Sequence, residues 1–276
     1  MRAHLGGSSR QSLVIARGKV DAAVKGATVE SASALSSELF FIGDTLESNI
    51  AIRRAITDPS RDGASKAALL KDLFGKSVGA TALTLVTEVS ALRWSATKDL
   101  VQVLEQLAIE AQASAANIAG ELDRVEEEIF TVSRAVATNY ELRTALTSPA
   151  SVAKAALVNE LLGKNSSVST LKLVSHLVEN WRSRSVESAF SDYEYALAAR
   201  RDRLIALVRV AAPLSPTQHI RLIDALTKQA GQPVRVNVEV DKSIVGGVSI
   251  KYADELVDGS VSHRLAGAGR ALAGSN

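Results

Sequence analysis

The residues that could support catalysis or metal binding are few and lie scattered along the chain. The four histidines are far apart, and none has a second histidine or a carboxylate at the spacing of a helical metal motif. The segment Asp258-Gly259-Ser260 offers a hydroxyl group, yet no Gly-x-Ser-x-Gly turn surrounds it. Gly246-Gly247 lacks the Gly-x-x-x-x-Gly-Lys-Ser/Thr arrangement that wraps a phosphate. The sequence therefore predicts no catalytic residue, no cofactor site and no metal site.

The composition indicates a globular protein that does not span a membrane. Of its 276 residues, 46% are hydrophobic and 22% are charged, as in ordinary packed domains. There is no cysteine, which excludes disulfides and thiolate chemistry. A formal net charge of +2, without a long run of Lys or Arg, argues against nucleic acid as a partner. No 18 consecutive residues are apolar, so any membrane association is expected to come through partner proteins.

Two strands are predicted around the paired glycines. Valine alternates with polar residues over Val234–Val240, which is the period of a half-buried strand. Asp241 suits the turn that follows, because its carboxylate can bond nearby backbone. Gly246-Gly247 permits a bulge before alternation resumes over Val248–Tyr252. We expect these two strands to pair with each other.

Further elements surround this pair of strands. The segment 204–211 is apolar on both faces, as a central strand or a short buried helix would be. Ser215 to Gln218 supply an N-cap, a proline at the first helical position and a capping-box glutamine. The helix that they start should bury one face, formed by Ile220, Ile223 and Leu226. Asp258 and Ser260 are expected to cap a last helix.

A repeat runs through the first two hundred residues. The segment Lys66–Lys76 resembles Lys154–Lys164 at a constant offset of 88 residues. In both segments a proline precedes the helix and a glycine, Gly75 or Gly163, ends it, which we attribute to the left-handed conformation that glycine enters at no steric cost. Apolar residues at helical spacing predict one buried face in each helix of the repeat: Leu70, Leu73 and Phe74, then Val158, Leu161 and Leu162.

The chain is therefore predicted to be mainly α, with tandem helical bundles followed by a small α/β domain. Helices joined by short connections pack as bundles. We expect the first bundle at residues 1–115, the second at 116–202 and the α/β domain at 203–276. The boundary between the bundles is placed where large apolar residues thin out over 111–120, although an Ala-rich helix could run straight through.

The C-terminal residues resemble the signature of the delta subunit of bacterial F-type ATP synthases, the oligomycin-sensitivity-conferring protein family. The likeness covers the last quarter of the chain closely and the helical region before it more loosely. The family has one N-terminal bundle, whereas this chain has what looks like two, as in the extended actinobacterial delta subunits. The matching residues are Asp241, Ile244, Gly246, Gly247, Asp258, Gly259, Ser260, Arg264 and Leu265.

The resemblance implies a mechanical role without bond chemistry and without a cofactor. It implies a peripheral-stalk, or stator, subunit that ties the stalk to the catalytic head and resists the torque of the rotor. The implied partners are the N-terminal helices of alpha subunits, bound by the bundles, and the C-terminal ends of the b subunits, bound by the α/β domain. The implied location is the cytoplasmic face of the cell membrane. Two bundles would then engage two alpha termini.

Trp94 and Trp181 are possible anchors for a partner. Each follows a Leu- and Val-rich helix and has an arginine beside it, so each suits either core packing, which we favour, or contact with a partner helix. Two alternative functions stay open. One is a free helical adaptor or regulatory protein that shares only the C-terminal module. The other is an enzyme using Asp258 or Ser260, which is disfavoured because no base or oxyanion donor set accompanies them.

Overall fold

The chain is mainly α with a small α/β part, as predicted. The computed structural model describes residues 5–148, 154–182, 184–200, 204–230, 234–241, 248–252 and 255–258. The chain divides into two compact units, residues 1–197 and residues 198–276. The first unit is helical, and the second contains the strands.

The helical unit contains two groups of helices in chain order. The first group comprises α1 Gly7–Val24, α2 Val29–Ser48, α3 Ile50–Thr57, α4 Gly63–Phe74, α5 Ala80–Ser90 and α6 Thr97–Ile118. The second group comprises α7 Leu122–Thr138, α8 Tyr140–Thr147, α9 Lys154–Leu162, α10 Val168–Glu179 and α11 Val186–Ala199. Apolar side chains from both groups form a single core cluster.

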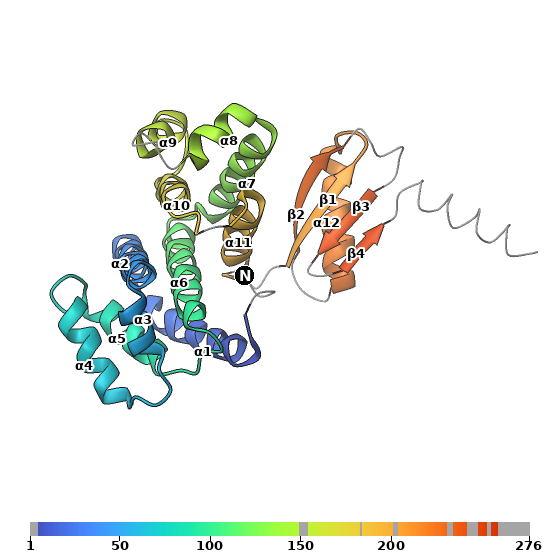
Figure 1. The fold of residues 1–276 in the computed structure, drawn as a ribbon. Coiled ribbons are helices and arrows are strands. Elements are labelled where there is room, and N and C mark those ends of the chain that lie inside the picture. The colour runs from blue at the N-terminus through green and yellow to red at the C-terminus, as the bar shows by residue number, and fades with distance from the viewer. Residues whose placement is uncertain are drawn as a thin grey trace, which may run out of the picture. The chain divides into compact units, whose positions relative to one another are not determined.

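The repeat seen in the sequence is a repeat of helices, and helix α6 belongs to both copies. Adding 90 to the bounds of α3 gives those of α8, and adding 88 to the first residue of α5 gives that of α10. Adding 88 to the first residue of α1 gives the start of α6 to within two residues, and adding 88 to the first residue of α6 gives the start of α11 to within two residues. The first copy is thus α1–α6 and the second copy is α6–α11. Figure 1 shows α6 between the two groups.

Helix α6 can serve both copies because it is buried on nearly every side, by apolar and small side chains and by carboxylates such as Glu105 and Glu110 that pair with other helices. Apart from Gln102, all its residues from Asp99 to Ala116 are buried. A helix that is buried all round packs against neighbours in several directions, and alanines let those neighbours come close. The junction predicted between residues 115 and 116 lies inside this helix. The helix ends at Ile118, and the φ of 73° at Gly120 allows the N–H of Glu121 to donate to the Ala116 carbonyl at 2.8 Å.

Several expectations for the repeated helices need correction. Helices α4 and α9 end just before Gly75 and Gly163, but neither glycine has a positive φ. Glycine suits these positions for another reason, because a Cβ there would lie too close to the carbonyl oxygen four residues earlier. Of the predicted apolar faces, Leu73 and Leu161 are exposed, since no neighbouring helix covers their side of α4 and α9 among the described residues.

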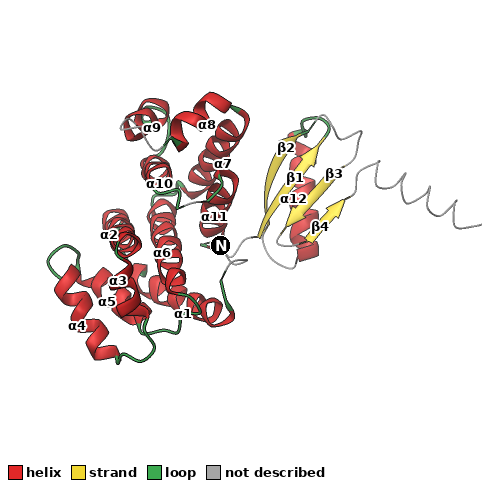
Figure 2. Cartoon of the chain, viewed as in Figure 1, coloured by secondary structure: helices red, strands yellow, loops and turns green. Residues whose placement is uncertain are grey.

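The described residues of the second unit form a four-stranded sheet and one helix, shown in Figure 2. The strands are β1 Leu204–Val210, β2 Val234–Val240, β3 Val248–Tyr252 and β4 Glu255–Asp258, in the order β2-β1-β3-β4. The predicted pairing of β2 with β3 is therefore wrong. Strand β1 lies between them, parallel to β2 and antiparallel to β3. Parallel neighbours need a crossover, and helix α12, Pro216–Ala230, supplies it between β1 and β2.

Helix α12 begins as the sequence predicts. The N–H of Ser215 donates to Gln218 Oε1 at 2.8 Å, and the N–H of Gln218 donates to Ser215 Oγ at 3.3 Å, which is a reciprocal capping box. Of the predicted face, Leu226 is buried and Ile223 packs against the core of the sheet, but Ile220 is 59% exposed. Leu222 takes the core position instead.

Candidate partner-binding surfaces

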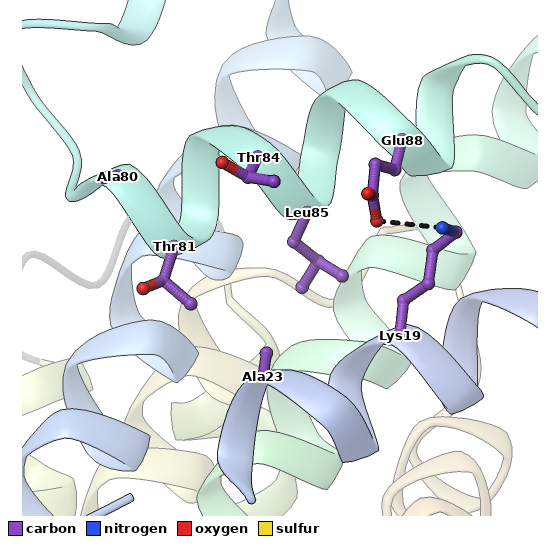
Figure 3. A pocket seen from close by; sticks show the side chains of 7 residues that line it. All are labelled: Lys19, Ala23, Ala80, Thr81, Thr84, Leu85 and Glu88. Atoms are coloured by element: carbon purple, nitrogen blue, oxygen red, sulfur yellow. Dashed lines mark hydrogen bonds and ion pairs between the residues drawn. The ribbon is translucent and has the colours of Figure 1, made fainter.

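An open groove lies between helices α1 and α5 of the first copy. It has a volume of about 390 Å³, and Figure 3 shows the side chains that line it. Leu85 forms the apolar floor, because its side chain is 3% exposed. The groove is open because several of its lining side chains are small and do not fill the space between the two helices. The lining residues are Lys19, Ala23, Ala80, Thr81, Thr84, Leu85 and Glu88.

The rim of this groove carries one ion pair and exposed apolar side chains. Lys19 Nζ lies 2.9 Å from Glu88 Oε2, across the groove from α1 to α5. One turn before Lys19, Ile15 continues the same row of α1 and is 50% exposed, and Val14 beside it is 60% exposed. A shallow groove with an apolar floor and charged ends has the chemistry that accepts one face of an amphipathic helix.

The corresponding region of the second copy, between α6 and α10, is joined to helix α2 by charged and polar contacts. Arg182 NH2 lies 2.6 Å from Asp44 Oδ1, and His176 Nε2 lies 3.1 Å from Asp44 Oδ2. The His176 ring stacks on Phe40 with ring centroids 3.7 Å apart. Lys172 Nζ donates to Ser33 Oγ at 3.0 Å. Helix α2 is therefore fixed against α10 at several positions along its length.

Beneath these contacts is a buried ionic network that ties α6 to α11. Glu105 has a fully buried carboxylate, and Arg184 NH2 lies 2.8 Å from its Oε1. Arg184 also contacts Asp192 at 3.0 Å. The Tyr193 hydroxyl lies 2.8 Å from His176 Nδ1 and thereby connects this network to the contacts of α2. Charges buried in this way are retained only when they are paired.

The pKa values of the contact residues reflect this burial. Burial lowers the pKa of Lys172 to about 8. For Asp44, burial raises the pKa, but the hydrogen bond and charge of His176 and the charge of Arg182 outweigh burial and hold the pKa below its usual value. Burial raises the pKa of Tyr193 well above its ordinary value. Asp44 is thus a carboxylate that the neighbouring residues of α10 and its C-terminal loop keep charged.

The two tryptophans pack on the edge of the core. Trp94 and Trp181 are both partly buried against the core cluster of the helical unit. Trp181 Nε1 donates to the carbonyl of Leu146 at 3.0 Å, and its ring meets Phe190 edge-on at 6.3 Å. Trp94 Nε1 is buried and has no hydrogen-bond partner among the described residues. Core packing accounts for most of the surface of each ring, and a role as partner anchor stays a prediction.

Few residues of the C-terminal signature lie within the described part of the chain. Asp241 follows β2, and its N–H donates to the Val210 carbonyl at 2.8 Å, which extends the parallel pairing by one residue. Asp258 is the last residue of β4 and pairs with Ser249 of β3, so the described part of the chain ends before the helix that it was expected to cap. The remaining signature residues lie outside the described residues: Ile244, Gly246, Gly247, Gly259, Ser260, Arg264 and Leu265.

The described residues hold no cluster of three or more His, Asp or Glu side chains that could bind a metal ion. Among the described helices, none is both long enough and apolar enough to cross a membrane. The helical unit instead has an open groove between α1 and α5 and a polar contact between α2 and α10. Grooves and helix contacts of this kind are used in protein recognition.

Comparison with known proteins decides the family. The family model described as ATP synthase delta (OSCP) subunit matches residues 108–272, which is more than half of the chain. The chain belongs to the ATP synthase delta (OSCP) subunit family. As a member of that family it is a non-catalytic subunit of the peripheral stalk, which links the stalk to the catalytic head and resists rotor torque. The match begins within α6, so it covers the second copy and the sheet unit.

Relatives of this delta family share the whole chain, including the first copy. The ATP synthase subunit delta of Streptomyces coelicolor is 42% identical over 97% of this chain and 98% of its own length. The ATP synthase subunit delta of Salinispora arenicola is 38% identical over 96% of this chain and 98% of its own length. A chain of the Toxoplasma gondii mitochondrial ATP synthase hexamer is 24% identical, with a TM-score of 0.37, covering 59% of this chain and 96% of that one. The last likeness is too low to compare folds.

The groove between α1 and α5 was not predicted from the sequence. Helical periodicity reports which residues face a core, but not which pair of helices leaves a space uncovered. A signal was present in the repeat itself. Lys19 of the first copy corresponds to Leu107 of the second, so this position is charged in one copy and apolar in the other.

Proposed function

We propose that the helical unit grips the N-terminal helix of an alpha subunit in the groove between α1 and α5. The observation that carries this proposal is the open groove with Leu85 at its floor and Ile15 exposed along the same row of α1. A helix bound there would bury apolar surface, and each Å² buried would stabilise the complex by about 25 cal/mol. The Lys19 and Glu88 side chains at the rim offer both signs of charge to polar residues on the helix.

We further propose that the sheet unit meets the C-terminal ends of the b subunits. Support comes from the family signature, whose residue Asp241 sits at the end of β2. Exposed apolar side chains of the same unit, Ile220 on α12 and Val240 on β2, supply contact area. Holding the head at one unit and the stalk at the other is what a connector must do to resist torque. In this assembly the chain lies at the cytoplasmic face of the cell membrane, through its partners.

Site-specific photo-crosslinking in purified ATP synthase tests both contacts. A benzophenone amino acid at exposed Thr84 should crosslink to the N-terminal segment of an alpha subunit, and one at Val240 should crosslink to a b subunit. Mass spectrometry of the crosslinked peptides identifies the partners.

Thr131 is the matched control, because it is also an exposed threonine of the helical unit but lies on α7, away from the groove. A crosslinker there should not capture the alpha N-terminal segment. Capture of that segment from Thr131 but not from Thr84 would place the contact elsewhere. Capture of a subunit other than b from Val240 would overturn the second contact.

A further inference from the structure

The two copies of the repeat differ in the exposure of several groove residues. Adding 88 to the groove positions of the first copy gives the equivalent positions of the second. Thr81 is exposed, whereas its equivalent Ser169 is 7% exposed. Ala23 is half-buried, whereas Ala111 is fully buried. The surface that is open between α1 and α5 is thus covered between α6 and α10.

Helix α2 is what covers it. The second-copy equivalents of Thr84 and Glu88 are Lys172 and His176, and both contact α2. Lys172 donates to Ser33 at 3.0 Å, near the start of α2, and His176 contacts Asp44 at 3.1 Å three turns later. Ser169 accepts a hydrogen bond from Gln112 Nε2 at 2.8 Å, and Ser33 donates to the same Gln112 side chain at 3.0 Å. Contact therefore runs along the second groove from Ser169 to His176, while Val168, the equivalent of Ala80, stays exposed at its end.

A partner helix could not easily displace α2. Its opposite side belongs to the core of the first copy, where Leu35, Leu39, Ile42 and Leu46 are at most 3% exposed. Lifting α2 would expose all four of these apolar side chains to water, which is unfavourable. Because α2 is part of the same chain, its effective concentration at the second groove also exceeds that of any free helix.

We infer that α2 is a built-in occupant of the second groove, so that each chain binds one partner helix, at α1 and α5 of the first copy. The inference rests on the proposed function for the identity of the partner, but the occupancy of the second groove stands on the contacts alone. It revises the expectation that two bundles engage two alpha termini. The copy that carries the family match has a covered groove, and the additional copy carries the open one.

Cysteine labelling tests the occupancy without any partner. The chain has no cysteine, so Thr81→Cys and Ser169→Cys each place a single thiol at equivalent positions of the two grooves. Thr81→Cys should react with a maleimide dye at least about 100-fold faster, because Ser169→Cys reacts only when α2 opens locally. Circular dichroism melts confirm that both variants are folded. Labelling rates within a few-fold of each other would overturn the inference.

Titration of the full chain with a synthetic peptide of the alpha-subunit N-terminus tests the stoichiometry. Calorimetry should give one peptide per chain. Thr84→Arg, which fills the open groove from an exposed position, should weaken binding by about tenfold or more, corresponding to at least 1.4 kcal/mol. The same substitution at exposed Thr131 should leave binding unchanged.

The outcomes separate the inference from the proposed function. Two peptides per chain would overturn the inference, because the second groove would then be accessible. One peptide whose binding Thr84→Arg leaves intact would also overturn it, because the partner helix would then bind away from α1 and α5. Absence of peptide binding together with slow labelling of Ser169→Cys would contradict the alpha-subunit contact while leaving the internal occupancy of the second groove supported.

Discussion

At the scale of single residues, two carboxylates organise the junction between the copies. Asp44 accepts contacts from Arg182 and His176, and Glu105 accepts contacts from Arg184. Arg182 adopts a φ of 51°, a conformation that costs a non-glycine residue about 1–2 kcal/mol. The contact of its guanidinium with Asp44 helps to offset that cost. The contacts of Asp44 hold α2 against the second copy, and those of Glu105 hold α6 against the residues before α11.

The lowered pKa of Lys172 gives a prediction at this scale. The Lys172 ammonium has a pKa of about 8 in the folded chain, against an ordinary value of 10.5. Below pH 8 the amine is charged in both states, so its cost to stability is constant. Between pH 8 and pH 10.5 the unfolded chain holds a proton that the folded chain has lost, so the unfolding free energy rises with pH.

We therefore expect the unfolding free energy of the natural chain to rise relative to that of Lys172→Met between pH 8 and pH 10.5. Urea unfolding at several pH values measures it. Taking the difference cancels the other groups that titrate there. A difference that stays constant from pH 7 to 10.5 would show that Lys172 is not buried beneath α2.

At the scale of elements, helix α6 makes the two copies inseparable. It is the last helix of the first copy and the first helix of the second, and its sides are buried against both. Arg17 of α1 lies 2.7 Å from Glu110 of α6, and its guanidinium lies 5.5 Å from the centre of the Tyr195 ring of α11. Fragments cut near residue 112 would divide this helix, so neither fragment would contain a complete copy.

Shared packing predicts that damage to the second copy is felt in the first. Glu105→Ala removes the carboxylate that pairs with Arg184, and breaking a buried pair costs about 3–5 kcal/mol. Single-tryptophan proteins made with Trp94→Phe or Trp181→Phe report each copy by fluorescence during urea unfolding, because the chain has two tryptophans. Glu105→Ala should lower the midpoint of both reporters equally.

The control for this prediction is Glu160→Ala, the same substitution at an exposed position of α9. It should change the unfolding free energy by no more than about 0.5 kcal/mol. A shift confined to the Trp181 reporter would mean that the copies unfold independently and would refute the shared core.

Features that depend on neighbours in the sequence could be predicted, whereas features that depend on contacts between distant residues could not. The capping box at Ser215 and Gln218 and the valine alternation of β2 are confirmed, because both depend on neighbours in sequence. The pairing of β2 with β3 is wrong, since a period of two defines the faces of a strand but not its neighbours. The open groove was missed for the same reason, because exposure of Thr84 depends on which helix lies above it.

At the scale of the whole molecule, the chain combines a stiff helical unit with a separate sheet unit. The first is held by a shared core and by buried ion pairs, and it offers an open groove between α1 and α5. The second is built on a central strand, β1, bonded on both sides. A stator subunit needs two such surfaces, because torque on the head is resisted only when head and stalk are both held. Nothing in this arrangement requires a bond to be made or broken.

Proton pumping by reconstituted ATP synthase tests this account most directly. Membranes that carry the proton channel and stalk are mixed with catalytic heads that lack this chain, and ATP-driven acidification is followed by a fluorescent dye with and without the purified chain. We predict that heads alone hydrolyse ATP with little pumping, that the natural chain restores pumping, and that Thr84→Arg restores it less well than Thr131→Arg. Equal pumping with and without the chain would contradict its role as the connection between stalk and head.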